Sequence, residues 1–163
     1  MISRDAVGFD FDESRMWNGA KVMFDDEMTT VTFDDGRTEL RGIIGELTST
    51  SIASSIAVCR KIVDVKLGLG VTSLGNSAFR PTSMGGYTSL ASVTIPSTVT
   101  SIGSKAFHCP SLSAIIFEGN APDIESDTFY RIKEGCKAIV SSSATGFDVD
   151  GEGKWNGLIV ERR

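Results

Sequence analysis

Apolar and polar residues alternate in short runs along the middle of the chain. In one such run, Leu90, Val93 and Ile95 are apolar, whereas Ser92 and Thr94 are polar. This alternation predicts a half-buried strand, because successive side chains of a strand point to opposite faces. The proline that follows ends the strand, since it has no N–H to donate to a ladder.

The run belongs to a unit that recurs along the sequence. Residues 65–79 recur as residues 93–107 at an offset of 28, and the next unit follows at an offset of 22, so that Phe107 corresponds to Phe129. One coil cannot bury its own apolar edge, so stability requires the stacking of about three or more coils. The pattern therefore predicts a β-rich solenoid of about four coils, with units that start near Ile43, Val65, Val93 and Ile115 and a remnant strand at residues 138–140.

The repeat also assigns roles to single positions. We expect Phe79, Phe107 and Phe129 to stack in one buried column. Gly103 is expected to adopt a backbone angle that a side chain would forbid. In the first unit, Thr50-Ser51-Ile52 is expected to replace Thr100-Ser101-Ile102.

The two ends of the array need caps, because an open solenoid exposes apolar faces. Two alternating runs, residues 29–33 and 38–43, flank the turn sequence Asp34-Asp35-Gly36-Arg37, which predicts a β-hairpin over the first coil. At the other end, residues 155–160 predict a last strand, with Trp155 sealing the final coil.

The sequence of residues 99–112, VTSIGSKAFHCPSL, resembles the repeat of the BspA-type leucine-rich-repeat proteins. The resemblance covers about residues 43–129 and implies a short leucine-rich-repeat array. We divide the chain into a β-hairpin cap (residues 1–42), the repeats (43–137) and a C-terminal strand cap (138–163), which together form one structural unit.

Members of this family are repeat proteins of bacterial surfaces, some protists and mobile elements, and they are usually linked to adhesion. The resemblance therefore implies a non-enzymatic module that binds a host or assembly protein through a ribbon of strands. The alternative is a structural or receptor-contacting component of a phage virion or another large assembly. Cell-surface or extracellular localisation is expected if a signal peptide has been removed, and a virion or cytoplasmic location otherwise.

Charge and hydropathy narrow the range of partners. The net charge of −5 and the pI near 4.9 argue against nucleic acid, whose backbone is bound by clustered Lys and Arg. No apolar run reaches the roughly 18 residues of a membrane helix, so we expect no membrane insertion.

Candidate chemistry is sparse. The one histidine, His108, is expected at the surface, because the neighbouring Cys109 is assigned to the interior. Cys59, Cys109 and Cys136 are odd in number and widely spaced, so we interpret them as reduced and structural. We therefore expect no catalytic residues, no zinc site and no cofactor.

One acidic loop has a spacing weakly suggestive of calcium. Asp148, Asp150 and Glu152 alternate along it, but the complete loop of about twelve residues with its closing glutamate is missing. We interpret it as a solvated loop and predict no metal site.

The expected partner surface combines the outer face of the strands with an insertion. Alignment of the units places positions 64, 92 and 114 in one exposed column and 66, 94 and 116 in the next. The insertion at residues 80–88 adds a methionine and a tyrosine, residue types enriched at interfaces. The alternative is that this loop has no role. The candidate partner-binding residues are Asp64, Lys66, Met84, Tyr87, Ser92, Thr94 and Ile116.

Overall fold

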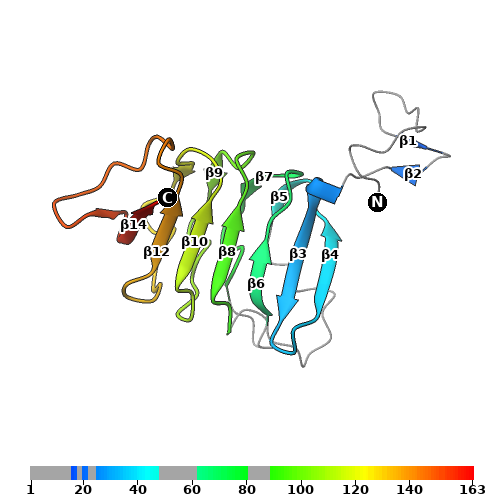
Figure 1. Cartoon of the computed structure of the whole chain (residues 1–163), viewed down its shortest axis with the longest axis horizontal. Helices are drawn as coiled ribbons and strands as arrows, with labels where there is room; N and C mark the ends of the chain where they lie inside the picture. The colour runs from blue at the N-terminus through cyan, green and yellow to red at the C-terminus, as the bar shows by residue number, and fades with distance from the viewer. Residues whose placement is uncertain (1–15, 18–19, 22–24, 48–61, 81–88) are drawn as a thin grey trace.

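The chain folds into a β-solenoid of about four turns, which Figure 1 shows as a row of strands running from the N-terminal to the C-terminal half. The computed structural model describes residues 16–17, 20–21, 25–47, 62–80 and 89–163. Within these residues there is no α-helix, and one short 3-10 helix, η1 (Asp25–Glu27), precedes the first long strand. The predicted solenoid is confirmed.

A large sheet of eight strands forms one side of the solenoid, and most of its strands are parallel and come from successive coils. These are β6 (Ile62–Lys66), β8 (Ser92–Ile95), β10 (Ala114–Phe117), β12 (Lys137–Val140) and β14 (Leu158–Arg162). Register follows the repeat: Val65 pairs with Val93 and Val93 with Ile115, at the offsets of 28 and 22 read from the sequence. The remnant strand predicted at residues 138–140 is confirmed as part of β12.

A smaller parallel sheet of four strands forms the opposite side. Its strands are β5 (Gly45–Leu47), β7 (Val71–Leu74), β9 (Ser101–Ile102) and β11 (Asp123–Ile124). Loop backbones between the sheets also bond from coil to coil, as when the N–H of Gly103 donates to the Leu74 carbonyl at 2.8 Å. Each coil therefore depends on its neighbour for both apolar burial and backbone pairing.

The predicted aromatic column lies between the sheets. The Phe79 and Phe107 rings stack with centroids 5.3 Å apart at 13°, and Phe107 and Phe129 with centroids 5.7 Å apart at 19°. Phe79 and Phe107 are completely buried, but Phe129 is only partly buried, contrary to expectation. Phe129 lies toward the end of the array, where no further phenylalanine follows and the edge of Trp155 meets its ring at 5.8 Å.

The N-terminal hairpin is confirmed. β3 (Met28–Phe33) and β4 (Thr38–Gly42) pair antiparallel, and β3 also pairs antiparallel with β6, the first parallel strand of the large sheet. Val31 and Phe33 of β3 are buried against the core. The hairpin thus covers the first coil, as the sequence predicted. A separate short pair, β1 (Met16–Trp17) and β2 (Ala20–Lys21), is also antiparallel.

The C-terminal cap differs from the single strand predicted over residues 155–160. β13 (Lys154–Trp155) and β14 form an antiparallel hairpin joined at Asn156 and Gly157, whose φ angles are 49° and 86°. Two successive positive φ angles are typical of the tight hairpin turn that Asn-Gly favours, so the sequence did contain the signal. Trp155 is buried and packs edge-on against Phe117 and Phe147, which confirms that it seals the last coil.

Two position assignments were wrong. In the first unit Leu47 pairs with Leu74, which pairs with Ile102, so Leu47 occupies the position expected for Ile52. Residues 50–52 themselves lie outside the described residues. Gly103 does not have a positive φ; a Cβ there would meet the Asn76 side-chain oxygen at 2.4 Å and its backbone nitrogen at 2.9 Å. Glycine is therefore needed at 103 for close approach of the preceding coil.

Candidate binding surface

The outer side chains of the parallel strands in the large sheet form two columns, which we call the ribbon face. Inward neighbours such as Val65, Val93 and Ile115 are buried, so the alternate positions point outward. Strand pairing aligns the outward residues of successive strands, so each of the two columns is a row that runs across the strands. The ribbon face comprises Asp64, Ser92, Ala114, Lys137 and Ile159 in one row and Lys66, Thr94, Ile116, Ile139 and Glu161 in the other.

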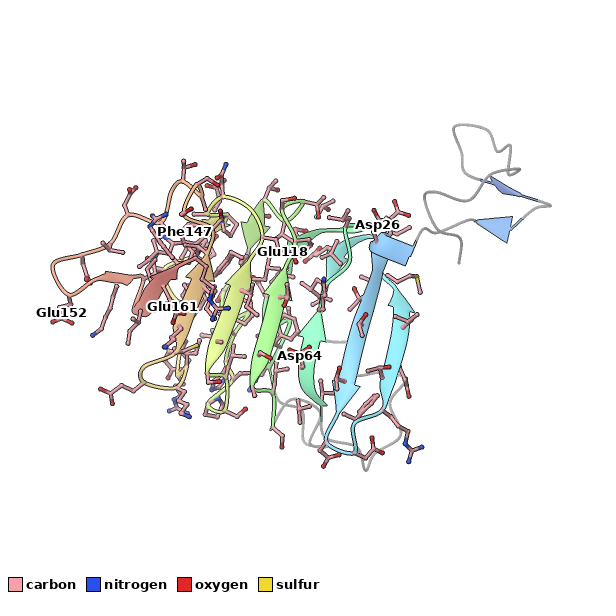
Figure 2. All side chains as sticks on the ribbon, in the orientation of Figure 1. Asp26, Asp64, Glu118, Phe147, Glu152 and Glu161 are labelled. Atoms are coloured by element: carbon pink, nitrogen blue, oxygen red, sulfur yellow. The ribbon has the colours of Figure 1, made fainter. Side chains whose placement is uncertain are left out.

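The ribbon face is polar at the end nearest the N-terminal cap. Asp64 accepts a hydrogen bond from the hydroxyl of Ser92, its register partner on the next strand. Lys66 forms an ion pair with Glu118, with Nζ and Oε1 3.8 Å apart. Figure 2 labels Asp64 beside β6 and Glu118 farther along the sheet. Because Glu118 follows β10, the Lys66 side chain extends across the intervening strand β8.

Thr94 is not exposed as predicted, since only 9% of it is accessible. Strand register places Thr94 between Lys66 and Ile116. The long Lys66 side chain reaching toward Glu118 and the branched Ile116 cover this small residue. The alternation correctly placed Thr94 on the outer side of the strand, but its neighbours shield it from solvent.

The other half of the ribbon face is mostly apolar, with Lys137 and Glu161 as its charged members. Ala114, Ile116 and Ile139 are half-buried, and Ile159 is 39% exposed. Ile139 and Ile159 were not among the predicted contacts, because residues 138–163 were assigned to a cap. Continuing the strand register from Ile116 to β12 and β14 identifies them.

One ion pair lies within this half of the ribbon face. Lys137 Nζ lies 2.9 Å from the Glu161 carboxylate, which also accepts a hydrogen bond from Arg163 at 3.2 Å. These hydrogen bonds, the one from Lys137 first, hold the pKa of Glu161 below its ordinary value. The Glu161 carboxylate therefore stays charged near neutral pH, and Figure 2 shows Glu161 at the C-terminal end of the sheet.

Five of the seven candidate residues thus share one surface: Asp64, Lys66, Ser92, Thr94 and Ile116. The other two, Met84 and Tyr87, lie outside the described residues.

Comparison with known proteins places this architecture in a family. The model of the BspA type leucine rich repeat region matches residues 36–148, in six copies. The chain belongs to the BspA-type leucine-rich-repeat family. Leucine-rich repeats are in general a non-enzymatic fold for protein–protein interaction. No curated protein and no solved structure matches the chain.

The match to the BspA-type model extends on both sides past residues 43–129, where the resemblance was expected. It begins at residue 36, in the turn of the N-terminal hairpin, and ends at residue 148, beyond β12. No helix among the described residues is long and apolar enough to cross a membrane.

The two described cysteines of this BspA-type array, Cys109 and Cys136, are both buried in the core. Cys109 is buried and its thiol donates to the Phe79 carbonyl, and Cys136 is buried and free. Burial raises the pKa of Cys109 to about 12 and that of Cys136 to about 11. Both remain thiols near neutral pH, where a nucleophile must be a thiolate. Cys59 lies outside the described residues.

His108 is half-buried rather than fully directed to solvent. Its ring meets the ring of Tyr130 at 5.5 Å in an edge-on arrangement. The repeat placed His108 at the surface but gave no indication of this aromatic neighbour.

In the acidic C-terminal loop, the carboxylates of Asp150 and Glu152 bind groups of the loop itself. Asp150 accepts hydrogen bonds from the backbone N–H groups of Glu152 and Lys154, both at 2.9 Å, and these bonds lower its pKa. Glu152, at the tip of the loop in Figure 2, pairs with the Lys154 ammonium at 2.7 Å. Asp148 is exposed. The part of the chain that is described contains no group of three or more His, Cys, Asp or Glu residues able to hold a metal ion.

Proposed function

We propose that the chain is a protein-binding module whose partner contacts the ribbon face. The observation that supports this most directly is a patch of apolar side chains on the outer side of the sheet: Ile116 and Ile139 are paired in register, Ala114 precedes Ile116 on the same face of β10, and Ile159 lies on the next strand beyond Lys137. A contiguous exposed apolar patch with a polar rim is typical of interaction sites on proteins.

The arrangement of charges around the patch fits this role. Interfaces have an apolar centre that excludes water and a rim of polar and charged groups. Here Lys66 with Glu118 borders the patch on the side of the N-terminal cap, and Lys137 with Glu161 lies beside the isoleucines on the last two parallel strands. Lys137 is paired with a carboxylate of the adjacent strand β14, and Lys66 reaches across β8 to Glu118, so both side chains are partly ordered before a partner binds and lose less entropy on binding.

The polar half of the ribbon face extends the same surface toward the N-terminal cap. We assign Asp64, Ser92 and Lys66 to the rim of the contact, and we propose that Met84 and Tyr87 of the insertion add to it. Thr94 is excluded as a direct contact because its neighbours cover it. Adhesion to another protein at a surface is the setting that we propose, in keeping with the family resemblance.

A matched pair of variants tests the proposal. Ile116→Glu introduces a charge into the apolar patch of the ribbon face. Val149→Glu makes a similar change at a loop position that is 50% exposed and lies off the ribbon face. Immobilised parent and variants are incubated with surface and secreted fractions of the source organism, and retained proteins are quantified by mass spectrometry. Thermal melts confirm that both variants are folded.

We expect the parent and Val149→Glu to retain the same proteins, and Ile116→Glu to retain them at least about tenfold less, a loss of about 1.4 kcal/mol. Equal retention by all three proteins would contradict the use of the ribbon face. Retention no higher than on blank resin would contradict the binding function in those fractions.

A further inference from the structure

A second surface lies at the corner of each coil, outside the aromatic column. The backbone N–H groups of Arg80, His108 and Tyr130 each donate to the carbonyl three residues earlier, at 3.0, 3.1 and 3.0 Å. The three residues follow Phe79, Phe107 and Phe129 directly, at the repeat offsets of 28 and 22. Equivalent turns in successive coils therefore stack Arg80, His108 and Tyr130 in one column, which we call the corner column.

Two cationic side chains and a histidine ring lie against the ring of Tyr130. The ammonium of Lys105 lies 5.7 Å from the ring centroid, the guanidinium carbon of Arg131 lies 5.3 Å from it, and the His108 ring meets it at 5.5 Å. Tyr130 is nevertheless 45% exposed. We call these four residues the tyrosine cluster: Lys105, His108, Tyr130 and Arg131.

The backbone of both cationic residues has an unusual conformation. Lys105 has a φ of 53° and Arg131 a φ of 56°. The left-handed region is uncommon for residues other than glycine, asparagine and aspartate. Ser77, the equivalent of Lys105 in the preceding coil, has a φ of 58°, so the angle at Lys105 belongs to the repeated turn. The turns thus set the backbone positions from which Lys105 and Arg131 reach the Tyr130 ring.

The cluster keeps cationic character in a chain whose net charge is −5. The nearest carboxylate to Lys105 is that of Asp127, at 3.8 Å, and this carboxylate also accepts a hydrogen bond from the Ser104 hydroxyl at 3.0 Å. Within the described part of the chain, no carboxylate forms an ion pair with Arg131. The guanidinium therefore has donors available for a ligand.

We propose that the tyrosine cluster binds an acidic, extended segment of a protein partner. Arg131 is suited to a carboxylate because its planar fork donates two parallel hydrogen bonds. The contact of the guanidinium with the Tyr130 ring, 5.3 Å from its centre, restricts the Arg131 side chain before binding, which reduces the entropy lost. Tyrosine and arginine are also the residue types most often found at the energetic centre of protein interfaces.

The geometry favours several carboxylates over one phosphate. A phosphate is bound by donors that converge on a single point, whereas the two cations here lie 5.7 and 5.3 Å from the centre of a ring. Carboxylates spaced along a peptide match this spread, and the exposed part of Tyr130 contacts the peptide between them. The shallow groove over the small sheet is lined instead by the carboxylates of Glu46, Asp123 and Glu125, which repel an acidic segment.

This site is separate from the ribbon face, so it can be tested independently. The probe is a fluorescein-labelled peptide of six Glu-Gly pairs, and the Gln-Gly peptide of the same length is its neutral control. Binding to the whole chain is followed by fluorescence anisotropy at low ionic strength. The protein variants are Arg131→Gln and Tyr130→Ala, with Arg163→Gln as the matched arginine change at the C-terminus.

We expect the Glu-Gly peptide to bind and the Gln-Gly peptide not to bind. Arg131→Gln and Tyr130→Ala should each weaken binding by about fivefold or more, while Arg163→Gln and Ile116→Glu leave it unchanged. No binding by the parent overturns the proposal, as does an equal effect of the two arginine variants, which indicates general charge attraction. Loss on Ile116→Glu instead assigns the peptide to the ribbon face, and displacement by millimolar inorganic phosphate indicates a phosphate site.

Discussion

Replacing Phe107 by alanine removes the middle ring of the aromatic column. Phe107 is 0% exposed and stacks on Phe79 on one side and on Phe129 on the other. Each coil of a solenoid contacts only its neighbours. A hole at this position therefore weakens two coil–coil interfaces at the same time.

The expected loss follows from burial and ring contacts. Complete burial of a phenylalanine side chain contributes about 1.5–3 kcal/mol, and each stacked aromatic pair adds about 0.5–1.5 kcal/mol. One ring and two pairs give about 2.5–6 kcal/mol in total. Phe→Ala changes in packed cores typically cost about 3–5 kcal/mol, and we expect Phe107→Ala to lower the free energy of unfolding by this amount.

Thermal melts followed by circular dichroism measure the effect. For a chain of this size, about 1 kcal/mol corresponds to about 2–4 °C in Tm, so the expected decrease is about 6–20 °C. Tyr130→Ala is the control, because it removes a surface ring next to the same column and should change stability by less than about 0.5 kcal/mol. A Phe107→Ala melt within about two degrees of the parent would refute the packed column.

Two further predictions concern close packing and buried thiols. Gly103→Ala should lower the free energy of unfolding by about 1–3 kcal/mol, because its Cβ would meet backbone of the preceding coil. Gly75→Ala should cost less than about 1 kcal/mol, since its closest contact is the flexible Glu46 carboxylate; equal costs in urea titrations would contradict this. Burial raises the pKa of Cys109 to about 12 and of Cys136 to about 11, from 9.0. In the unfolded chain the thiols ionise near pH 9, whereas in the folded chain they ionise only at the higher pKa values. The free energy of unfolding is therefore unaffected by the thiols below pH 9 and falls by about 1.4 kcal/mol per pH unit and thiol as the pH rises from 9 toward the folded-state pKa values. A variant with both cysteines changed to alanine should show a smaller loss of stability over this alkaline range.

The repeat offsets were sufficient to predict most of the architecture. Stacked coils must place equivalent apolar positions against one another, so an offset read from sequence is also a strand register. Val65, Val93 and Ile115 are paired as those offsets require. The same reasoning gave the aromatic column, and ordinary turn signals gave the N-terminal hairpin.

The errors arose where a position depends on a side chain from another coil. Thr94 is covered because Lys66 extends across it toward Glu118, and this ion pair links strands that are not adjacent. Gly103 is needed because Asn76 occupies the space of a Cβ, not because of its own φ. The first unit lacks the glycine and phenylalanine of the others, and apolar residues alone did not fix its register at Leu47.

The repeat offsets predict the positions of the corner column but not the contacts of its side chains. The two offsets that align the phenylalanines also align the residues that follow them, so the offsets alone place Arg80, His108 and Tyr130 in one column. The contact between the His108 and Tyr130 rings follows from this alignment, since the two residues are 22 positions apart. The contacts of Lys105 and Arg131 with Tyr130 could not be predicted from the offsets, because both residues adopt left-handed backbone angles that neither residue type predicts. The column can therefore be derived from sequence, whereas its binding chemistry depends on two turns that only the folded chain reveals.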